Sequence, residues 1–387
     1  MIGARIRQAR VKAGMTQKEV AAALNAAGIA IKTNQVGKFE HDRDMPNAQT
    51  LMELSRLFAV PPVWLMYEPG PEIKWLAYRK RSTLTAKTRQ AIEGYARDVA
   101  ELQIELRVQI CPDVTVNLPE QIPVWDDTGA EEAAGILRQA WNLGDGPIAS
   151  LTRTAEENGV VVVDWNCDSK GFDGLSGWYG DDVPVVVIKG DVSADRKRFS
   201  LAHELGHLVM QTPVDMPDKQ TEKLAHRFAG ALLVSAEVAR REFRELGSRV
   251  GFTRLDMLKQ KYGLSMQGWV YRAKDLGLIS SGFAQSFWQD LNQHGFKRQE
   301  PFDFVADEKP VLLEQMIVTA MEKGLISPYK VLQAIPDFDF SRMETETDVF
   351  PTATELMEMP KEQRNRLTAV SFALAAKEDF ERFEAFG

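Results

Sequence analysis

Hydrophobic residues recur with a helical period through the first 66 residues of the chain. Ile6 and Ala9 fall on one face of a first helix, and Gly14 is expected to end it because glycine readily takes the left-handed conformation of helix ends. Thr16 then caps a second helix, with Glu19 three residues later to complete a capping box. Two further short helices are expected in IKTNQVGKFE and TLMELSRLF. The pattern predicts a small, all-helical N-terminal region.

The middle of the chain changes from helical periodicity to short runs of β-branched residues. GVVVVDW and VPVVVIKG are rich in valine and bounded by glycine or proline, so each predicts a strand. LSGWYG, between them, predicts a third strand of a small sheet. Helical patterns flank the sheet and resume beyond residue 280, so the chain as a whole is expected to be α+β. The flanking helices are expected at 87–110, 130–141, 150–158 and about 201–210, with another from Thr221.

Length and composition indicate more than one globular domain. The 387 residues exceed the usual size of a single domain, and a hydrophobic content of 44% allows real cores. Residues 68–83 include Pro69, Gly70 and Pro71 and then the basic stretch YRKRS, which is typical of a linker or hinge. We therefore expect a domain boundary there.

Charge is distributed unevenly along the chain. The net charge of −8 argues against a protein that coats nucleic acid over its whole surface. Residues 1–66, however, hold nine Lys and Arg against five Asp and Glu, so the acidic excess lies in the remainder. This asymmetry favours a small DNA-binding unit attached to an acidic body.

Several classes of protein are disfavoured by what the sequence lacks. It has no run of about 18 apolar residues, so we expect no membrane-spanning helix and no membrane partner. The N-terminal MIGARIRQAR has no apolar core of a secretory signal. Cys111 and Cys167 are too few for a disulfide framework or a thiolate metal cage, which fits a reducing cytoplasm. A cytoplasmic protein is expected.

The stretch LAHELGHLVM, residues 201–210, carries the pattern H-E-x-x-H. His203 and His207 are four residues apart and project from nearly the same face of a helix, so they can bind one metal ion. Glu204 lies about 100° around the helix, where it can reach water at the metal but not easily the metal itself. Zinc lowers the pKa of such a water to about 7, and Glu204 would take its proton as the general base. The simpler alternatives are two polar residues at the edge of a core, or a metal with a purely structural role.

A catalytic zinc needs a third protein ligand and an open position for water. Glu222 fits best, because it lies at the start of the helical stretch TEKLAHRFAGALL, after a plausible reversal of the chain. Asp215 and Asp218 in the intervening loop are the alternatives. His226, one turn after Glu222, is left open as an outer partner, a transition-state donor or an extra ligand. Two histidines and a glutamate bind Zn²⁺ but also accept other divalent metals.

The N-terminal region has the layout of a helix-turn-helix, in which one helix enters the major groove and the preceding helix is anchored on phosphates. Gln17, at the start of the second helix, can bond a phosphate. The stretch IKTNQVGK presents amide and ammonium groups to base edges and backbone. The alternative is a protein-interaction module with solvated polar residues. The expected DNA-contacting residues are Gln17, Lys32, Thr33, Asn34, Gln35 and Lys38.

Two parts of the chain resemble known families. IRQARVKAGMTQKEVA and VGKFEHDRDMPNAQTLMELSRLFAV resemble the lambda-repressor-like (XRE) helix-turn-helix family, with a longer turn in NAAGIAIKTNQ. GLSGWY, PVVVIKG, RKRFSLAHELGHLVM and TEKLAHRFAGALLV are similar to the ImmA/IrrE metallopeptidases. This resemblance implies a zincin-like fold, with His203, His207 and Glu222 as ligands and Glu204 as general base. The family usually has Asn at the position of His226. Its members typically cleave or disable a transcriptional repressor after stress, or regulate mobile elements.

Together these inferences predict a DNA-binding transcriptional regulator with a zinc-dependent endopeptidase domain. A homodimer is expected to read two half-sites of a double-stranded operator, and the peptidase to cleave one particular protein, a repressor, in a stress or mobile-element response. The strand LSGWY, as a sheet edge, could pair with an extended substrate segment. The alternative is a non-catalytic transcription factor or antitoxin-like autoregulator that uses the metallopeptidase fold as a sensor or dimerisation module.

The expected division of the chain follows the order of these features. A helix-turn-helix domain takes residues 1–67, and a linker and helix take 68–115. The zincin-like metallopeptidase domain takes 116–280. A mainly helical C-terminal region, to which the sequence assigns no role, takes 281–387.

Overall fold

The computed structural model describes residues 2–66, 70–76, 84–112, 114–166, 171–246, 250–297 and 299–340. The stretch YRKRS of the expected linker and the part of the expected C-terminal region from residue 341 on lie outside these described residues. The chain divides into two compact units that are not consecutive in sequence. As far as they are described, unit 1 takes in Met1–Glu72, Thr85–Asp113 and Val311–Gly387, and unit 2 takes in Ile73–Leu84 and Val114–Pro310.

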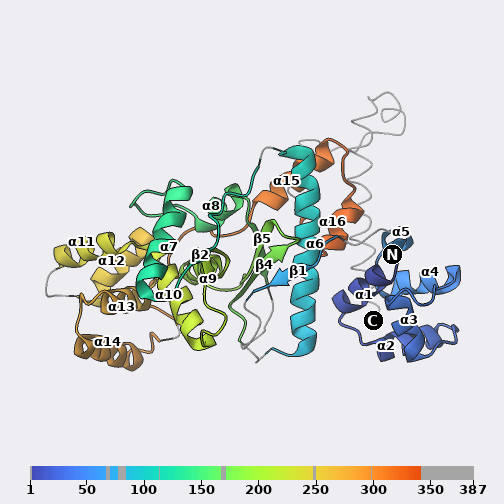
Figure 1. The fold of residues 1–387 in the computed structure, drawn as a ribbon, viewed down its shortest axis with the longest axis horizontal. Helices are drawn as coiled ribbons and strands as arrows, with labels where there is room; N and C mark the ends of the chain where they lie inside the picture. The colour runs from blue at the N-terminus through green and yellow to red at the C-terminus, as the bar shows by residue number, and fades with distance from the viewer. Residues whose placement is uncertain are drawn as a thin grey trace. The chain divides into compact units, whose positions relative to one another are not determined.

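Five short helices form the N-terminal part of unit 1 (Figure 1). Thr16 accepts a hydrogen bond from the N–H of Glu19, and the Glu19 carboxylate accepts one from the N–H of Thr16, so the expected capping box is present. Gly14 follows the first helix with a φ of +62°, the left-handed value that ends helices. Ile6 and Leu24 are among the side chains buried between the helices. These helices are α1 (Ile2–Lys12), α2 (Gln17–Ala26), α3 (Thr33–Glu40), α4 (Ala48–Leu57) and α5 (Pro62–Met66).

A long helix completes unit 1 together with the last two described helices. Arg5 on α1 forms an ion pair with Glu101 on this long helix at 2.6 Å, and Gln8 donates a hydrogen bond to Asp98 at 2.9 Å. The same helix packs against both later helices, which come from a distant part of the sequence. These elements are α6 (Ala86–Ile110), α15 (Leu312–Glu322) and α16 (Pro328–Ala334).

The main sheet of unit 2 has the strand order β1-β4-β5-β3. The two valine-rich strands, β3 and β5, run parallel to each other, and β4 runs antiparallel to both β5 and β1. The three expected strands are therefore present, and the α+β class is confirmed. Within the expected linker or hinge, residues 73–75 form a strand that the sequence did not indicate, because a three-residue strand beside proline and glycine is too short to show an alternating pattern. The strands are β1 (Ile73–Trp75), β3 (Val161–Trp165), β4 (Gly174–Tyr179) and β5 (Val183–Lys189).

Strand β4 is not the free sheet edge that the sequence suggested. Lys74 of β1 pairs with Trp178, and Trp75 pairs with Gly177, so residues 177–179 lie between two strands. The N–H of Leu76 also donates to the carbonyl of Ser176 at 3.0 Å. The prediction of an open edge along LSGWY is corrected accordingly.

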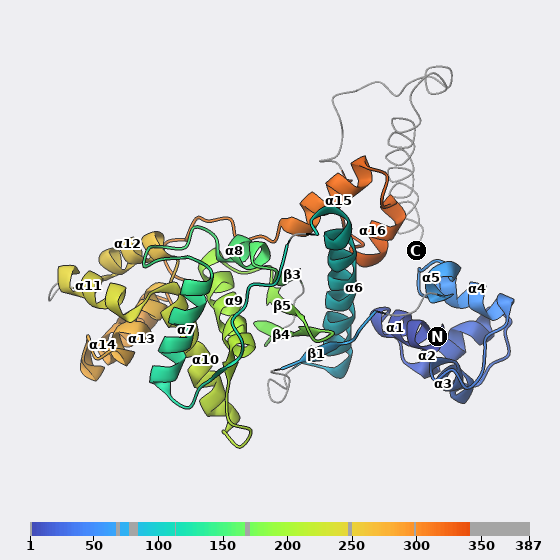
Figure 2. The same ribbon diagram turned by 45° about the horizontal axis from the view of Figure 1, so that its top comes forward.

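Helices cover this sheet and build the core of unit 2. Helix α9 packs against β4 and β5 and against α10, which in turn packs against α7 (Figure 2). A second, two-stranded parallel sheet pairs β2 with β6 where the chain leaves α9. Among the described residues no helix is both long and apolar enough to cross a membrane. The elements are β2 (Ile122–Pro123), β6 (Met210–Gln211), α7 (Asp127–Ala140), α8 (Leu151–Glu157), α9 (Ala194–Val209), α10 (Asp218–Leu233), α11 (Ala236–Leu246), α12 (Phe252–Tyr262), α13 (Met266–Asp275) and α14 (Ser281–Gln293).

The expected C-terminal region is divided between the two units. Residues 281–310 group with unit 2, and the core of that unit includes Phe287 and Leu291 of α14. Beyond α14, the carboxylate of Glu300 accepts the backbone N–H groups of Met266 and Gln267, both at 3.0 Å. Glu300 thus caps α13, because the first N–H groups of a helix have no partner within it.

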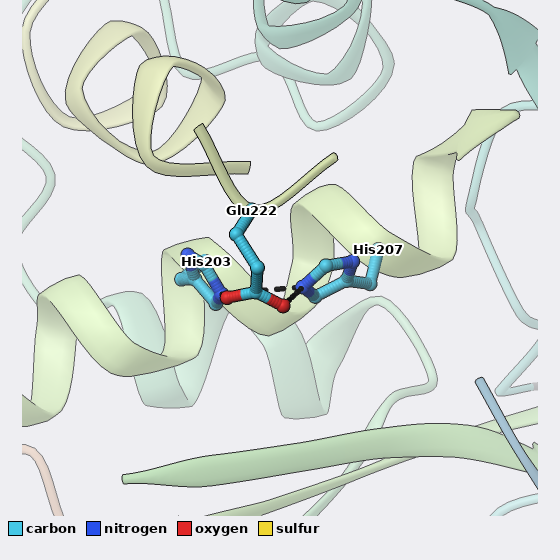
Figure 3. A group of neighbouring side chains, drawn as sticks. All are labelled: His203, His207 and Glu222. Carbon is cyan, nitrogen blue, oxygen red and sulfur yellow. Dashed lines mark hydrogen bonds and ion pairs between the residues drawn. The ribbon is translucent and has the colours of Figure 1, made fainter. Parts of the chain in front are cut away.

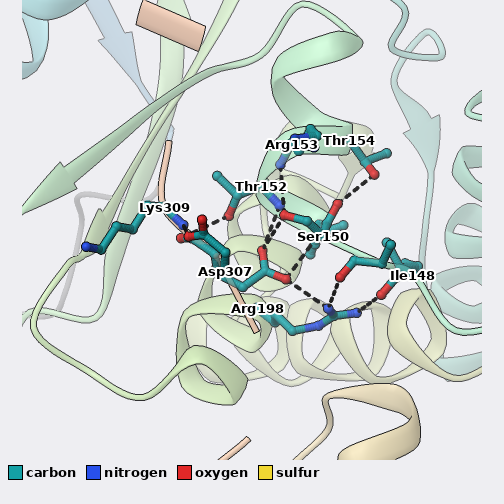
Figure 4. A network of polar contacts seen from close by, with 11 residues as sticks. Ile148, Ser150, Thr152, Arg153, Thr154, Arg198, Asp307 and Lys309 are labelled. Carbon is teal, nitrogen blue, oxygen red and sulfur yellow. Dashed lines mark hydrogen bonds and ion pairs between the residues drawn. The ribbon is translucent and has the colours of Figure 1, made fainter. Parts of the chain in front are cut away.

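A second glutamate, Glu308, attaches the same segment to α8 and α9. Glu308 accepts the backbone N–H of Thr152 at 2.9 Å at the start of α8 and forms an ion pair with Arg198 of α9 at 2.8 Å. Arg198 also donates to the carbonyl of Ile148 at 2.7 Å (Figure 4). Both charged side chains are fully buried. This network joins residues far apart in sequence around the helix that carries the histidine pair.

Candidate functional site

Helix α9 carries both histidines of the H-E-x-x-H pattern on the side that faces α10. Leu201, Ala202 and Leu205 of this helix are fully buried, and His203 and His207 lie about one turn apart. An added Cβ at Gly206 would lie 3.0 Å from the ring of Phe228 on α10. The absent side chain therefore lets α10 approach the histidines closely.

Glu222, on α10, lies between the two imidazoles (Figure 3). Its two carboxylate oxygens lie 3.4 Å from Nε2 of His203 and 3.5 Å from Nε2 of His207. The two Nε2 atoms are 3.2 Å apart. Ligand atoms about 2.0–2.1 Å from one tetrahedral zinc lie roughly 3.3 Å from each other. The three side chains therefore have the spacing that a single bound metal ion requires.

Electrostatics at this cluster favour an ionised glutamate. Partial burial opposes the charge of Glu222, but hydrogen bonds and the positive field from His203 and His207 outweigh it and hold the pKa of that carboxyl far below its usual range. A carboxylate that stays ionised is the form that binds a cation. Among the described residues, His203, His207 and Glu222 form the group of histidine, cysteine or acidic side chains whose ligand atoms all lie close enough together to bind one metal ion.

The alternatives to Glu222 do not join the cluster. Asp215 is exposed in the loop before α10, and Asp218 is the first residue of that helix. His226 donates its Nδ1–H to the carbonyl of Glu222 at 2.7 Å, and its ring centre lies 4.5 Å from that of His203. His226 is thus beside the three converging side chains but not one of them.

Glu204 faces the sheet rather than α10. Its carboxylate accepts a hydrogen bond from the hydroxyl of Ser176 on β4 at 2.8 Å, and both residues are buried. An added Cβ at Gly174 would lie 2.8 Å from the Glu204 carboxylate. Glu204 lines the same cavity as His203 and Glu222. Sequence reasoning did not single out Ser176, although a serine within an otherwise buried strand was a usable signal.

The expected DNA-contacting residues lie mainly at the start of α3. Lys32, Thr33, Asn34 and Lys38 are exposed, whereas Val36 is fully buried against the rest of unit 1. Gln35 is half-buried. Gln17 is at the first position of α2 and donates its side-chain N–H to Glu40 of α3 at 2.7 Å. The start of α3 is therefore an exposed polar surface. Gln17 links α2 to α3 through its hydrogen bond to Glu40.

Comparison with known proteins identifies two parts of the chain. Residues 6–65 match the helix-turn-helix family, and residues 155–274 match the IrrE N-terminal-like domain of the M78 peptidases. The HTH-type transcriptional regulator ImmR of Bacillus subtilis (strain 168) is 40% identical over 65 residues, which is 17% of this chain and 47% of that protein. The match therefore spans about half the length of that relative. Both resemblances expected from the sequence are confirmed: the chain carries an N-terminal helix-turn-helix domain followed by an IrrE N-terminal-like domain.

Proposed function

We propose that the chain is a transcriptional regulator whose helix-turn-helix binds operator DNA and whose unit 2 is a zinc-dependent endopeptidase. Its substrate is one particular protein, a repressor, and the regulator acts as a homodimer. One observation carries the peptidase proposal. The Nε2 atoms of His203 and His207 and the carboxylate of Glu222 are spaced for one ion, and Glu204 lines the same cavity without joining them.

Each side chain at the site has a separate role in peptide hydrolysis. His203, His207 and Glu222 would hold the metal, and a bound zinc would polarise the substrate carbonyl and make nearby water more acidic. Glu204 takes a proton from the attacking water and returns it to the leaving amine. Ser176 keeps the Glu204 carboxylate oriented through its hydroxyl.

Removing the third ligand is expected to weaken metal binding sharply. Glu222→Ala should lower zinc affinity by at least about 100-fold, because loss of a ligand costs more than the 10- to 100-fold loss typical of its outer partners. Asp218→Ala on the same helix is the control and should bind zinc like the wild type. Competition with a chromogenic chelator measures both. Equal affinity of the Glu222→Ala protein and the wild type would exclude Glu222 as a ligand.

Ser176 is expected to affect turnover more than binding. Ser176→Ala should lower kcat by about 10- to 100-fold with little change in KM or zinc affinity, because one hydrogen bond to a charged group is worth about 1.5–3 kcal/mol. Ser176→Thr keeps the hydroxyl and should recover most of the rate. A fall in zinc affinity equal to the fall in kcat would instead show that Ser176 only supports the fold.

The DNA proposal rests on the exposed polar face of α3. Lys38→Ala should weaken operator binding and reduce the slope of log affinity against log salt by about one, the value for one lost phosphate contact. Lys323→Ala, an exposed lysine at the end of α15, is the control. Fluorescence anisotropy at several salt concentrations measures both variants. An affinity that ignored both salt and the loss of Lys38 would count against groove docking.

A further inference from the structure

The strand that borders the candidate active site is covered by another segment of the same chain. Ser176 of β4 holds Glu204, and Gly174 and Leu175 of the same strand line the cavity with the histidines. β1 runs antiparallel along β4 from Tyr179 to Gly177. An extended peptide added to a sheet uses the same N–H and C=O groups of its edge strand. β1 therefore occupies part of the place that an extended substrate would take.

The contact between the two strands is close and specific. A Cβ on Gly177 would lie 2.7 Å from the carbonyl oxygen of Lys74 and 2.9 Å from the ring of Trp75. The N–H of Leu76 continues the pairing to the carbonyl of Ser176, the residue that holds Glu204. An aromatic side chain over a strand glycine is a known means of fixing a register. Gly177 therefore gives β4 the space that the backbone and the tryptophan of β1 need.

The segment that contains β1 comes from outside the peptidase domain. The match to the IrrE N-terminal-like domain begins at residue 155, and the match to the helix-turn-helix ends at residue 65. Ile73–Leu84 groups with unit 2, whereas the stretches on both sides of it, Met1–Glu72 and Thr85–Asp113, group with unit 1. Leu84, at the far end of this excursion, lines the cavity that contains Glu204. The chain leaves its DNA-binding unit here and returns to it.

We propose that Ile73–Leu76 is a blocking strand, which closes the β4 edge to substrate until it is displaced. The proposal rests on the proposed peptidase function of unit 2. The competing ligand is an extended segment of a protein substrate, which would add to β4 in the same antiparallel direction. The blocking strand begins at Ile73, a few residues after the helix-turn-helix match ends at residue 65, so a change in the DNA-binding unit can act on the strand through this short connection.

Proline substitution opens the edge without altering β4. Hydrogen-bonded and non-bonded pairs alternate along an antiparallel ladder, so the Leu76–Ser176 bond places the N–H of Lys74 toward β4 as well. Lys74→Pro/Leu76→Pro removes both donors. Lys74→Ala/Leu76→Ala removes the same side chains but keeps the donors, and is the matched control. Trp75→Ala is a milder second variant that needs no proline.

Binding of a fluorescent peptide with the sequence EIKWL tests the proposal directly. All proteins are full-length, carry Glu204→Gln to prevent cleavage, and are checked for zinc content and thermal unfolding. The proline protein should bind the peptide about tenfold or more tightly than the alanine control, and Trp75→Ala should give a smaller gain over the wild type. Gly177→Ala in the proline background should abolish the gain, because its Cβ would meet the peptide backbone. Equal binding by wild type, Trp75→Ala and the proline protein would overturn the blocking strand.

Failure of the two proposals can be told apart. Peptide binding in the Glu204→Gln background does not depend on catalysis. With Glu204 restored and zinc bound, the proline protein should also hydrolyse a fluorogenic peptide at least about tenfold faster than the alanine control. A gain in peptide binding, with no cleavage of either the fluorogenic peptide or the captured partner protein by any variant, would reject the peptidase function. It would still show that β1 covers an edge of β4 that can bind an extended peptide.

Discussion

Replacing Glu204 by Gln is expected to stop cleavage of the partner protein while leaving zinc and DNA binding intact. An amide has nearly the same shape as a carboxylate, and its oxygen can still accept the Ser176 hydroxyl, but it cannot take a proton from water. Loss of a general base typically costs 10²- to 10⁴-fold in rate, so about that reduction is expected here. Single-turnover cleavage of the captured substrate measures it.

The same variant identifies the substrate. A Glu204→Gln protein should retain the partner in a pull-down, because the complex forms but does not turn over. Glu237→Gln, on the exposed side of α11, is the control and should cleave normally. If gene regulation in cells survives Glu204→Gln undiminished, the non-catalytic regulator becomes the better account of unit 2.

Breaking the buried ion pair between Arg198 and Glu308 is expected to destabilise unit 2 by about 3–5 kcal/mol, the usual cost of leaving a buried charge unpaired. Glu308→Ala also strips the cap from the N–H groups at the start of α8. Since Arg198 lies little more than one turn before His203 on α9, zinc affinity should fall with stability. Differential scanning calorimetry of the intact chain measures the effect on the transition that zinc raises.

Two matched variants sharpen this prediction. Arg196→Ala, on the same helix, removes an exposed pair with Asp173 and should cost less than about 1 kcal/mol. Arg198→Met/Glu308→Leu removes both buried charges and should recover part of the loss seen for Glu308→Ala. If the Glu308→Ala and Arg196→Ala proteins unfold at the same temperature, the buried network does not hold α9 in place.

Features encoded over short distances in the sequence were predicted well. The capping box of Thr16 and Glu19, the turn at Gly14 and the valine-rich strands each depend on residues within one turn or one strand. Periodicity and capping report the local conformation directly, so the α+β class and the helix-turn-helix follow from the sequence. The four-residue spacing of His203 and His207 is a local feature of the same kind.

Contacts between distant residues were decided only by the tertiary structure. Ser176 reaches Glu204 across 28 positions, and Arg198 reaches Glu308 across 110. No local pattern encodes such pairs, because each partner satisfies its own helix or strand equally well without the other. β1 shows this most clearly: its three residues follow a stretch with two prolines and a glycine and are too few to show a period, and only pairing with β4 makes them a strand. The sequence by itself determined the helices with a clear period, the valine-rich strands and the histidine pair. Packing of α10 against Gly206 brought Glu222 to the histidines, and pairing with β4 made residues 73–75 a strand.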